Sequence, residues 1–321
     1  MKIKRIAVLT SGGDSPGMNC AVRSVVRFAH WKGIEIFGVM HGYRGLISEE
    51  FIPLGPRDVS NIISRGGTIL KAARCEEFYE KEGREKAYKN LISRNIDGLI
   101  VIGGDGSFHG ALLLHQEFGF PVVGIPGTID NDINGTQRTL GFDTALNTAM
   151  SAIDKIKDTA TSMDRIFLIE VMGRLSSAIA VFSALAGGAE DVIIPGERTD
   201  LKNMIEKIEE GRKKGKKSWI IIVAEGAGKA EEFAREFRKY ISDVRVTVIG
   251  HLQRGGGPSA FDRILGALMG QAAVQALLEG KHCHAIGWRN DDVIVYKLQE
   301  AIKPQDRGKI SFYHQLIHIL T

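Results

Sequence analysis

Two short polar loops carry the residues of this chain that are best suited to chemistry. Residues 126–132, Pro-Gly-Thr-Ile-Asp-Asn-Asp, put two carboxylates and a hydroxyl on one turn directly after the apolar run 121–125. Carboxylates this close repel each other, and folding does not require them there, whereas a site that takes a proton and handles a metal-bound phosphate does. The loop 103–107, Gly-Gly-Asp-Gly-Ser, follows a second apolar run, 98–102. Together the two loops predict one active-site rim.

The polar residues of these loops have distinct candidate roles. Asp130 is the candidate base for a substrate hydroxyl, Asp132 is placed to tune it or to act through a metal, and Thr128 is placed to position the acceptor. Asp105 is placed to hold Mg²⁺ while the adjacent glycines let a nucleotide phosphate approach. The alternative is a pair of ordinary Asx and glycine turns, which two close carboxylates beside a second Gly-Asp loop disfavour.

Further candidate phosphate-binding groups lie outside these loops. Residues 10–19, Thr-Ser-Gly-Gly-Asp-Ser-Pro-Gly-Met-Asn, can present bare backbone N–H groups and a helix N-terminus to a phosphate, although an ordinary βα turn explains them equally well. His251 and Arg254 precede three glycines and form a natural phosphate clamp, because Arg is a bidentate donor and a protonated His adds charge. Glu225 ends an apolar strand and is suited either to accept hydrogen bonds from sugar hydroxyls or to cap a helix.

Four arginines and one basic run are more ambiguous. Arg74 follows a Gly-Gly-Thr turn, and Arg165, Arg174 and Arg245 lie beside predicted strands, but each alone is also typical of a solvated surface. The run 211–217, Gly-Arg-Lys-Lys-Gly-Lys-Lys, is typical of a solvated helix end. The alternative for that run is a second anion site used for regulation.

The bulk composition indicates a globular α/β protein. The chain has 321 residues, of which 44% are hydrophobic and 25% charged, enough for a large core in two domains. No apolar run approaches the roughly 20 residues of a membrane span, and the apolar stretch at the N-terminus is too short for a signal peptide. Three cysteines, Cys20, Cys75 and Cys283, show no metal-ligand spacing and fit a reducing cytosol. The net charge of +4 is too mild to suggest nucleic acid as a partner.

Strands, glycine loops and helices alternate along the chain. The predicted strands are 5–10, 34–39, 98–102, 121–125, 166–171, 191–194, 218–224 and 244–249. A helix is predicted from the first loop to about Trp31, and another over 144–160, whose apolar face comprises Leu146, Ala149, Met150, Ile153, Ile156 and Ala160. Continuous apolar strands between helices predict two doubly wound, Rossmann-like three-layer domains with mostly parallel sheets. Ligands of such sheets bind at the carboxyl ends of the strands, where every glycine loop here falls.

In this order, the loops resemble the bacterial ATP-dependent 6-phosphofructokinase family. The match runs from Ile6 to about Gly280 and rests on TSGGDSPGMN, RGGT, GGDGS, PGTIDNDI, GFDTALNT, EVMGR, VAEG and GHLQRGG. The resemblance implies a cytoplasmic kinase that converts MgATP and fructose 6-phosphate to ADP and fructose 1,6-bisphosphate, the committed step of glycolysis. It also implies a homotetramer whose active sites are shared between subunits.

The resemblance implies a role for each matching residue. Asp130 would take the proton from the sugar 1-hydroxyl with Asp132 beside it, Thr128 and Arg174 would hold the acceptor and the transferring phosphoryl group, and Asp105 would hold Mg²⁺. Arg74 and the backbone at Gly13 would stabilise the phosphates. The implied ATP-site residues are Gly13, Tyr43, Arg74, Cys75, Arg84, Asp105, Gly106, Ser107 and Gly110. The implied sugar-phosphate residues are Thr128, Ile129, Asp130, Met172, Gly173, Arg174, Glu225, His251, Leu252, Gln253 and Arg254, with Arg165 and Arg245 reaching the 6-phosphate from a neighbouring subunit.

The family also implies a domain division and an effector site. Residues 1–141 with 256–303 would bind ATP, and residues 142–255 with 304–321 would bind fructose 6-phosphate. The residues that match the effector site for ADP or phosphoenolpyruvate are Arg23, Arg27, Gly188, Glu190, Lys216 and Lys217, with Asn61, Lys157 and Lys214 at positions where the family usually has Asp or Arg. Because Lys keeps the charge of Arg but loses its planar fork, an altered or weakened effector response is expected. The segment Leu175–Ser177 also departs from the family pattern, and this departure puts its local backbone in doubt.

Four alternative functions are weighed against this reading. A pyrophosphate-dependent enzyme of the same fold would carry Asp at position 106 and Lys at position 127, where this chain has Gly106 and Gly127. A lipid or NAD kinase would share the Gly-Gly-Asp-Gly loop but not the segments at 128–132 and 251–256. A non-catalytic nucleotide or sugar-phosphate sensor gains nothing from unneutralised acids, and a redox Rossmann protein would need G-x-G-x-x-G after its first strand.

Overall fold

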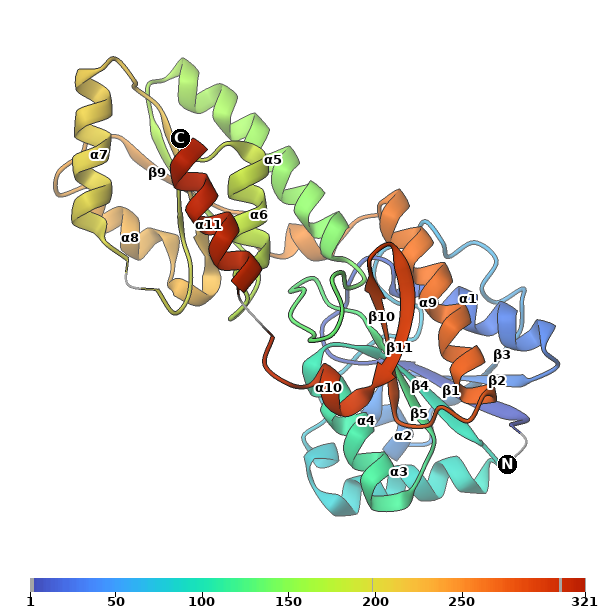
Figure 1. Cartoon of the computed structure of the whole chain (residues 1–321). Coiled ribbons are helices and arrows are strands. Elements are labelled where there is room, and N and C mark those ends of the chain that lie inside the picture. The colour runs from blue at the N-terminus through green and yellow to red at the C-terminus, as the bar shows by residue number, and fades with distance from the viewer. Residues whose placement is uncertain (1–2, 198, 306–307, 321) are drawn as a thin grey trace. The chain divides into compact units, whose positions relative to one another are not determined.

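The chain folds into two compact units of alternating strands and helices (Figure 1). This computed structural model describes residues 3–197, 199–305 and 308–320. The first unit comprises Met1–Thr144 and Arg254–Gln305, and the second comprises Ala145–Gln253 and Asp306–Thr321. The chain therefore leaves the first unit after Thr144, returns to it at Arg254 and leaves it again for a last segment in the second unit.

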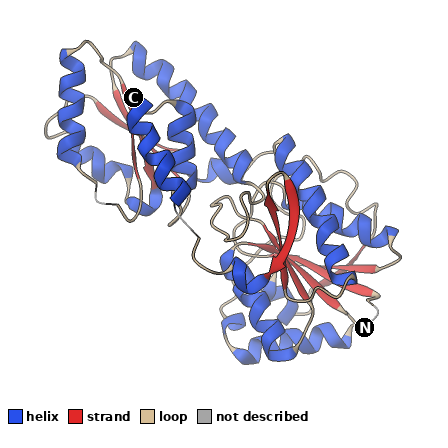
Figure 2. Ribbon diagram, in the orientation of Figure 1, coloured by secondary structure: helices blue, strands red, loops and turns tan. Residues whose placement is uncertain are grey.

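A seven-stranded sheet forms the centre of the first unit (Figure 2). Its strands, in spatial order, are β11 (Asp292–Lys297), β10 (His284–Arg289), β5 (Val122–Pro126), β4 (Gly98–Gly103), β1 (Arg5–Thr10), β2 (Glu35–Val39) and β3 (Phe51–Leu54). The five strands from β10 to β2 run parallel, whereas β3 and β11 pair antiparallel at the two edges. The four predicted strands of this unit are confirmed to within one residue at either end.

Helices cover both faces of this sheet, as the continuous apolar strands predicted. Ile6 and Val8 of β1 face the core under α1 (Met18–Trp31) and α9 (Ala260–Leu278). Ala7 and Leu9 face the opposite core. The elements on that side are α2 (Tyr43–Ile47), η1 (Glu77–Tyr79), α3 (Lys81–Ser93), α4 (Asp105–Phe118) and α10 (Leu298–Ala301). Successive side chains of a strand point to opposite faces, so one apolar strand supplies both cores.

Three strands of this sheet, β3, β10 and β11, were not predicted from the sequence. β3 is an edge strand that contains Pro53, a residue that cannot donate to a ladder and therefore argues against a central strand. β10 and β11 form a hairpin whose turn residues, Asn290 and Asp291, have φ values of 53° and 60°. Two successive left-handed residues suit the twist of a two-residue hairpin turn, but the usual glycine signal is missing here.

The second unit is built on a smaller, wholly parallel sheet. Its four strands, in spatial order, are β7 (Asp191–Ile193), β8 (Trp219–Ala224), β6 (Ile166–Val171) and β9 (Val244–Val248). α7 (Leu201–Lys213) and α8 (Ala230–Phe237) share a core with these strands. α6 (Ala178–Gly187) packs against β7 and β8, and α11 (Gly308–Leu320) packs against α6. All four predicted strands of this unit are confirmed.

The long helix α5 (Phe142–Ser162) starts in the first unit and continues in the second. Ala149, Ile153 and Ala160 of its predicted apolar face are fully buried, which confirms the helical periodicity. The remaining residues of that face, Leu146, Met150 and Ile156, are partly buried.

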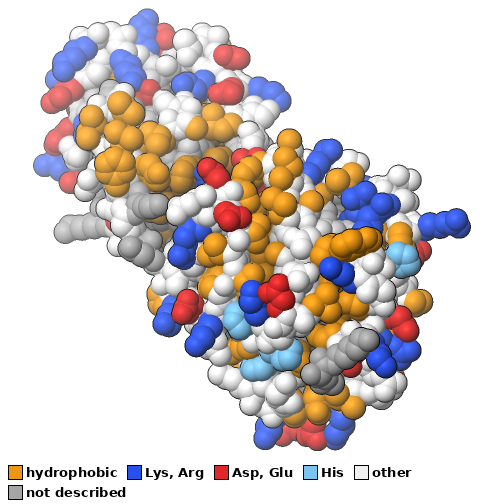
Figure 3. Space-filling model, turned by 45° about the vertical axis from the view of Figure 1, so that its right-hand side comes forward, with side chains coloured by type: hydrophobic (Ala, Val, Ile, Leu, Met, Phe, Trp, Pro, Cys, Tyr) orange, Lys and Arg blue, Asp and Glu red, His pale blue; other side chains and the backbone are white. Residues whose placement is uncertain are grey.

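The surface is mixed in character. Figure 3 shows Lys, Arg, Asp and Glu side chains interspersed with hydrophobic ones over the visible face of both units. Among the helices in the described ranges, none combines the length and apolar character that crossing a membrane requires.

Asp262 of α9 anchors the point at which the chain leaves the first unit. This carboxylate is fully buried and accepts hydrogen bonds from the backbone N–H groups of Gly141 and Thr144, both at 2.9 Å, and from the Thr144 hydroxyl at 2.5 Å. Ser259 Oγ accepts from the Asp262 backbone N–H, so it caps α9. Burial raises the pKa of Asp262 to about 6, because desolvation outweighs the donors that favour the charged form.

This raised pKa predicts that Asp262 stabilises the fold more at low pH than at neutral pH, the reverse of the usual behaviour of a carboxylate. The folded protein binds the Asp262 proton more tightly than the unfolded chain does, so the contribution of Asp262 to stability is largest near pH 4 and declines as the pH rises to about 6. Relative to Asp262→Asn, the wild type should lose about 1–3 kcal/mol of its free energy of unfolding over that window. Urea unfolding followed by tryptophan fluorescence from pH 4 to pH 7 measures this difference. A wild-type advantage that grows with pH would instead show an ionised carboxylate stabilised by its donors.

Candidate active site

The three glycine loops of the first unit meet at one edge of its sheet. Strands β1, β4 and β5 are parallel neighbours, and their registers pair Thr10 with Ile102 and Gly103 with Pro126. Just beyond the strand ends, the Ser11 N–H donates to the Ile102 carbonyl at 2.9 Å. The N–H of residue 127 likewise donates to the carbonyl of residue 103, also at 2.9 Å. The predicted rim of loops is therefore present in this unit.

The first loop is shaped by a close arginine. Gly12 has φ 84°, and Gly17, which precedes α1, has φ 101°. A Cβ on Gly13 would lie 2.4 Å from a guanidinium nitrogen of Arg254, so a larger residue there would displace that guanidinium. The same guanidinium donates to the Asp14 carbonyl at 2.9 Å. The structure thus brings together two residues, Gly13 and Arg254, that are 241 positions apart in the chain and were predicted separately as phosphate binders.

The second loop places an exposed carboxylate at a helix start. Asp105 is the first residue of α4, its side chain is 53% exposed, and its Oδ1 lies 3.4 Å from His109 Nδ1. A Cβ on Gly106 would meet nothing within 4 Å, so the space beside Asp105 is open. The described residues contain no group of three His, Cys, Asp or Glu that could hold a metal by itself. This arrangement suits Mg²⁺, which usually takes one or two carboxylates and completes its shell with waters and phosphate oxygens.

The third loop holds the candidate base in a pinned turn. Asp130 is 4% exposed, and its backbone N–H donates to Thr128 Oγ1 at 3.1 Å. The Thr139 hydroxyl, itself buried, donates to the Thr128 carbonyl at 2.6 Å. Asn131 takes the left-handed φ of 49° and donates from Nδ2 to the Gln137 carbonyl at 3.3 Å. Asp132 is partly buried in the same turn, and Ile129 is fully buried beneath it.

Several residues predicted for the ATP site pack against the loop 103–107 and are buried or half-buried. Tyr43 is 5% exposed, its hydroxyl donates to the Ser107 carbonyl at 2.5 Å, and its ring stacks on Phe78 at 4.0 Å. Burial strongly raises the pKa of Tyr43, so this hydroxyl stays protonated. A Cβ on Gly110 would lie 2.9 Å from the Tyr43 ring, which explains the glycine there. Cys75 is half-buried beside this cluster.

The two predicted ATP-site arginines differ in their surroundings. Arg74 is exposed in the segment that follows the hydrogen-bonded pair Thr10 and Thr68. Arg84 is 5% exposed and forms a double hydrogen bond with Glu117, at 2.7 and 2.6 Å. Its remaining donors reach two main-chain carbonyls of η1. The Arg84 guanidinium is thus occupied by the fold, and its contacts give no support to the prediction that it binds ATP.

In the second unit, most of the predicted sugar-phosphate residues gather at the carboxyl ends of three neighbouring strands. Met172, Gly173 and Arg174 follow β6, and Glu225 begins η2 (Glu225–Ala227) directly after β8. His251, Leu252 and Gln253 lie in η3 (Gly250–Arg254), which follows β9. His251 and Leu252 are exposed, whereas Gln253 is buried and accepts from the Met172 N–H at 2.8 Å.

Glu225 makes contacts that the sequence did not predict. Its Oε1 accepts hydrogen bonds from the N–H groups of Gly173, at 3.2 Å, and Arg174, at 2.7 Å. Arg174 has φ 48°, a left-handed conformation that costs a non-glycine residue about 1–2 kcal/mol. The segment Leu175–Ser177, whose backbone was in doubt, forms a turn closed by the Ser176 N–H on the Gly173 carbonyl at 2.7 Å.

The other two predicted sugar-phosphate arginines lie at the opposite end of this sheet. Arg165 directly precedes β6, and Arg245 is the second residue of β9. Both pair with Asp243, at 3.2 Å and 2.8 Å respectively. A strand rises about 3.3 Å per residue, so the length of β6 puts about 20 Å between Arg165 and Arg174. Within this unit the two groups cannot reach the same phosphate.

The predicted effector residues are divided between the two units. In the second unit, Lys157 donates to the Gly187 carbonyl beside Gly188 at 2.7 Å, and Lys216 pairs with Glu190 at 2.8 Å. Lys217 pairs with an acid, Asp164, at 3.3 Å, and Lys214 is exposed at the end of α7. In the first unit, Arg27 and Asn61 are exposed, and Arg23 is partly buried on α1.

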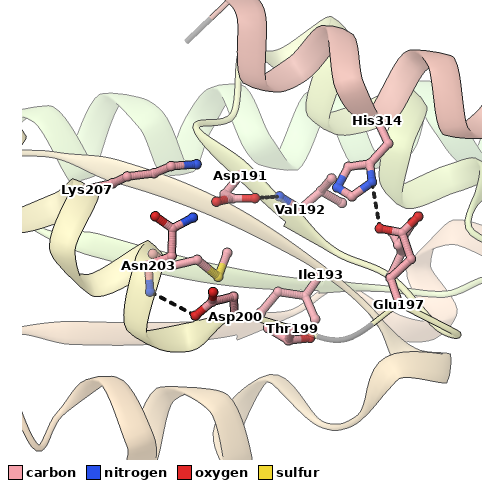
Figure 4. A pocket seen from close by; sticks show the side chains of 11 residues that line it. Asp191, Val192, Ile193, Glu197, Thr199, Asp200, Asn203, Lys207 and His314 are labelled. Atoms are coloured by element: carbon pink, nitrogen blue, oxygen red, sulfur yellow. Dashed lines mark hydrogen bonds and ion pairs between the residues drawn. The ribbon is translucent and has the colours of Figure 1, made fainter.

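A cavity of about 320 Å³ lies beyond the carboxyl end of β7 and contains none of the predicted site residues. Figure 4 shows Asp191, Asp200 and Lys207 around it, with His314 of α11 paired to Glu197 at 3.0 Å. Asp200 accepts from the Asn203 N–H and caps α7. Asp191 likewise accepts from the Val192 N–H, at 2.8 Å, so most of the charged groups around this cavity contact the fold or one another.

Comparison with known proteins identifies the family. The phosphofructokinase family matches residues 5–277. An ATP-dependent 6-phosphofructokinase 1 from Thermus thermophilus is 53% identical over 304 residues, which cover 94% of each protein. An ATP-dependent 6-phosphofructokinase from Brevibacillus brevis is 50% identical over 320 residues, which cover 99% of this chain and all of that protein.

Solved structures agree with this assignment. A phosphofructokinase from Saccharomyces cerevisiae has a TM-score of 0.89 and 36% identity, and the match covers 98% of this chain and 48% of the yeast chain, so this chain spans about half of that length. A pyrophosphate-dependent phosphofructokinase from Marinobacter aquaeolei shares the fold, with a TM-score of 0.84 at 22% identity over 98% of this chain and 91% of that chain. The resemblance drawn from the sequence motifs is confirmed: the chain belongs to the phosphofructokinase family.

Proposed function

We propose that this chain transfers a phosphoryl group from MgATP to the 1-hydroxyl of fructose 6-phosphate, giving ADP and fructose 1,6-bisphosphate. The single observation that carries the proposal is the rim of the first unit, where an open Gly-Asp loop and a buried aspartate in a pinned turn follow neighbouring parallel strands. Phosphoryl transfer asks mainly for positioning and charge neutralisation, and these loops offer both. Relatives that are about 50% identical carry the name ATP-dependent 6-phosphofructokinase.

We assign the donor residues to the first unit. Backbone N–H groups at Gly13 and the Arg74 side chain would hold phosphate oxygens, and Asp105 would hold Mg²⁺. When bound, Mg²⁺ neutralises phosphate charge. Asp130 would accept the proton of the sugar hydroxyl, since hydrogen bonds through Thr128 and Thr139 fix the backbone of the turn that carries it.

We assign the acceptor residues to the second unit. Arg174 would steady the transferring phosphoryl group, and Glu225 and His251 would bind the sugar phosphate. Arg165 and Arg245 would bind the 6-phosphate of a neighbouring copy, because the length of β6 keeps them about 20 Å from Arg174 in their own unit. The domain division into ATP and sugar-phosphate parts, the homotetramer, the cytoplasmic location and a weakened ADP or phosphoenolpyruvate site belong to the same proposal.

Two glycines favour ATP over pyrophosphate as the donor. Open space at Gly106 leaves room for a nucleotide, which an aspartate there would occupy. A Cβ on Gly127 would lie 3.0 Å from Ile102 and 3.1 Å from Met18, so a lysine at this position requires the core to shift. A pyrophosphate-dependent enzyme is therefore the weaker alternative.

The donor assignment predicts a clear split in a coupled assay. Fructose 1,6-bisphosphate should form from fructose 6-phosphate and Mg²⁺ with ATP and not with pyrophosphate. Gly106→Asp should keep its melting temperature, because its Cβ meets open space, and lose at least about tenfold in kcat/KM for ATP. Gln116→Asp, on an exposed turn of the same helix, is the matched control and should be unaffected. Product with pyrophosphate alone would overturn the donor assignment.

The base assignment predicts a defect in turnover rather than in binding. Asp130→Asn should lower kcat by about 10²–10⁴-fold while leaving ATP and fructose 6-phosphate affinities within a few fold, because it removes the proton acceptor and keeps the shape. Steady-state kinetics and calorimetric titration of both ligands measure the two effects. Asp154→Asn, on the exposed side of α5, controls for the loss of a charge. Near-normal turnover in Asp130→Asn would remove this residue from the role of base.

Shared active sites predict complementation between two inactive variants. Asp130→Asn and Arg165→Ala each disable every site in a pure oligomer, but a mixed oligomer contains sites that draw Asp130 from one copy and Arg165 from another. Denaturing and refolding the two variants together should restore about one quarter of the wild-type activity, the fraction expected for random pairing. Separately refolded variants mixed afterwards are the control. Absence of any recovery, in oligomers shown to be mixed, would place both residues in one copy.

A further inference from the structure

The carboxylate of Glu225 is divided between two tasks. Its Oε1 accepts both the Gly173 and the Arg174 backbone N–H groups, at 3.2 and 2.7 Å. Its Oε2 makes no hydrogen bond with the residues that the structure describes. Oε1 therefore binds the backbone of residues 173 and 174, and Oε2 takes no part in those hydrogen bonds.

The backbone held by Oε1 does not follow a relaxed path. Arg174 has φ 48° and Gly173 has φ 144°, so two successive residues take positive values that side chains rarely adopt. Such a path persists only where neighbouring groups over-determine it. Paired amide donors on one carboxylate oxygen provide that constraint, because hydrogen bonds to a charged acceptor are stronger than neutral ones.

A second contact from η2 tightens the same backbone. A Cβ on Gly226 would lie 1.8 Å from the Arg174 carbonyl oxygen, so the two main chains touch at a position where only glycine fits. β6 and β8 are parallel neighbours with Val171 opposite Ala224, and the segments that follow them leave the sheet side by side. Glu225 and Gly226 thus hold the Arg174 backbone at two points, its N–H group and its carbonyl. We call this pair of contacts the grip.

We propose that Glu225, together with Gly226, positions Arg174 for phosphoryl transfer by fixing its backbone, separately from any hydrogen bond that Oε2 makes with the sugar. This role rests on the proposed function, in which Arg174 steadies the transferring phosphoryl group. The direction of the Arg174 side chain depends on the orientation of its Cα–Cβ bond. That orientation is set by φ and ψ. Loss of the grip therefore displaces the charge without removing it, and small displacements are costly in catalysis.

Kinetics of three variants test this role. Glu225→Ala and Gly226→Ala should each lower kcat by about 10²-fold, because both release Arg174, and should leave the KM for ATP unchanged. Glu225→Gln should restore most of the kcat lost in Glu225→Ala, because the glutamine oxygen still accepts both N–H groups, and should raise the KM for fructose 6-phosphate, because the sugar loses a charged acceptor. Glu232→Ala, an exposed acid of the first turn of α8, is the control and should behave as wild type. If Glu225 serves only as a sugar ligand, Glu225→Ala raises the KM for fructose 6-phosphate with kcat unchanged, and Gly226→Ala is neutral.

Hydrogen exchange separates this proposal from the proposed function. In the protein without substrates, the amides of residues 173 and 174 should exchange at least about tenfold faster in Glu225→Ala than in wild type or Glu225→Gln. Unchanged exchange in Glu225→Ala would overturn the positioning role whatever the enzymatic activity is. Faster exchange in Glu225→Ala, together with a wild-type protein that makes no fructose 1,6-bisphosphate, would leave the grip standing and refute the reaction. The comparison of Glu225→Ala with Glu225→Gln is sufficient to test the positioning role. Misfolding of Gly226→Ala therefore does not affect the outcome.

Discussion

The parallel pairing of neighbouring strands is the constraint on which the functional loops depend. Parallel strands end at the same edge, and the hydrogen bonds of the ladder continue one residue beyond the strands, from Ser11 to Ile102 and from residue 127 to residue 103. Each glycine loop is thereby placed within reach of the next before any ligand is present. The second unit repeats this arrangement with β8, β6 and β9.

Crowding at these edges then decides which residues are possible. A Cβ on Gly103 would lie 2.5 Å from the Ser107 hydroxyl, and a Cβ on Gly226 would lie on the Arg174 carbonyl. Glycine is required at such points because backbones approach each other closely. The lack of a side chain also lets phosphate approach. At Gly106 the reverse holds: the position is open, and packing does not require a glycine there.

Much of this arrangement could be predicted from the sequence. Buried parallel strands are continuous apolar runs, so eight of them were found, and the glycine loops marked their carboxyl ends. The hairpin β10–β11 and the edge strand β3 were missed, because Asn290-Asp291 lacks a glycine and Pro53 suggests a loop. The partners of individual side chains could not be predicted from the sequence. Arg84 meets Glu117 and Glu225 meets residue 174 only through tertiary packing, which no local pattern encodes.

The arginines of the second unit show why placement within one unit matters more than residue type. Arg174 lies at the carboxyl end of β6, whereas Arg165 and Arg245 lie at its amino end and share the single carboxylate of Asp243. One carboxylate cannot neutralise two guanidinium groups, so this pair keeps a net positive charge at the surface and favours an anion from outside its own sheet. The net charge of +1 that remains would attract a phosphate group. Under the proposed function, the same unit would steady the phosphoryl group of one reaction and bind the sugar phosphate of another, which would give this fold a chemical reason to associate with copies of itself.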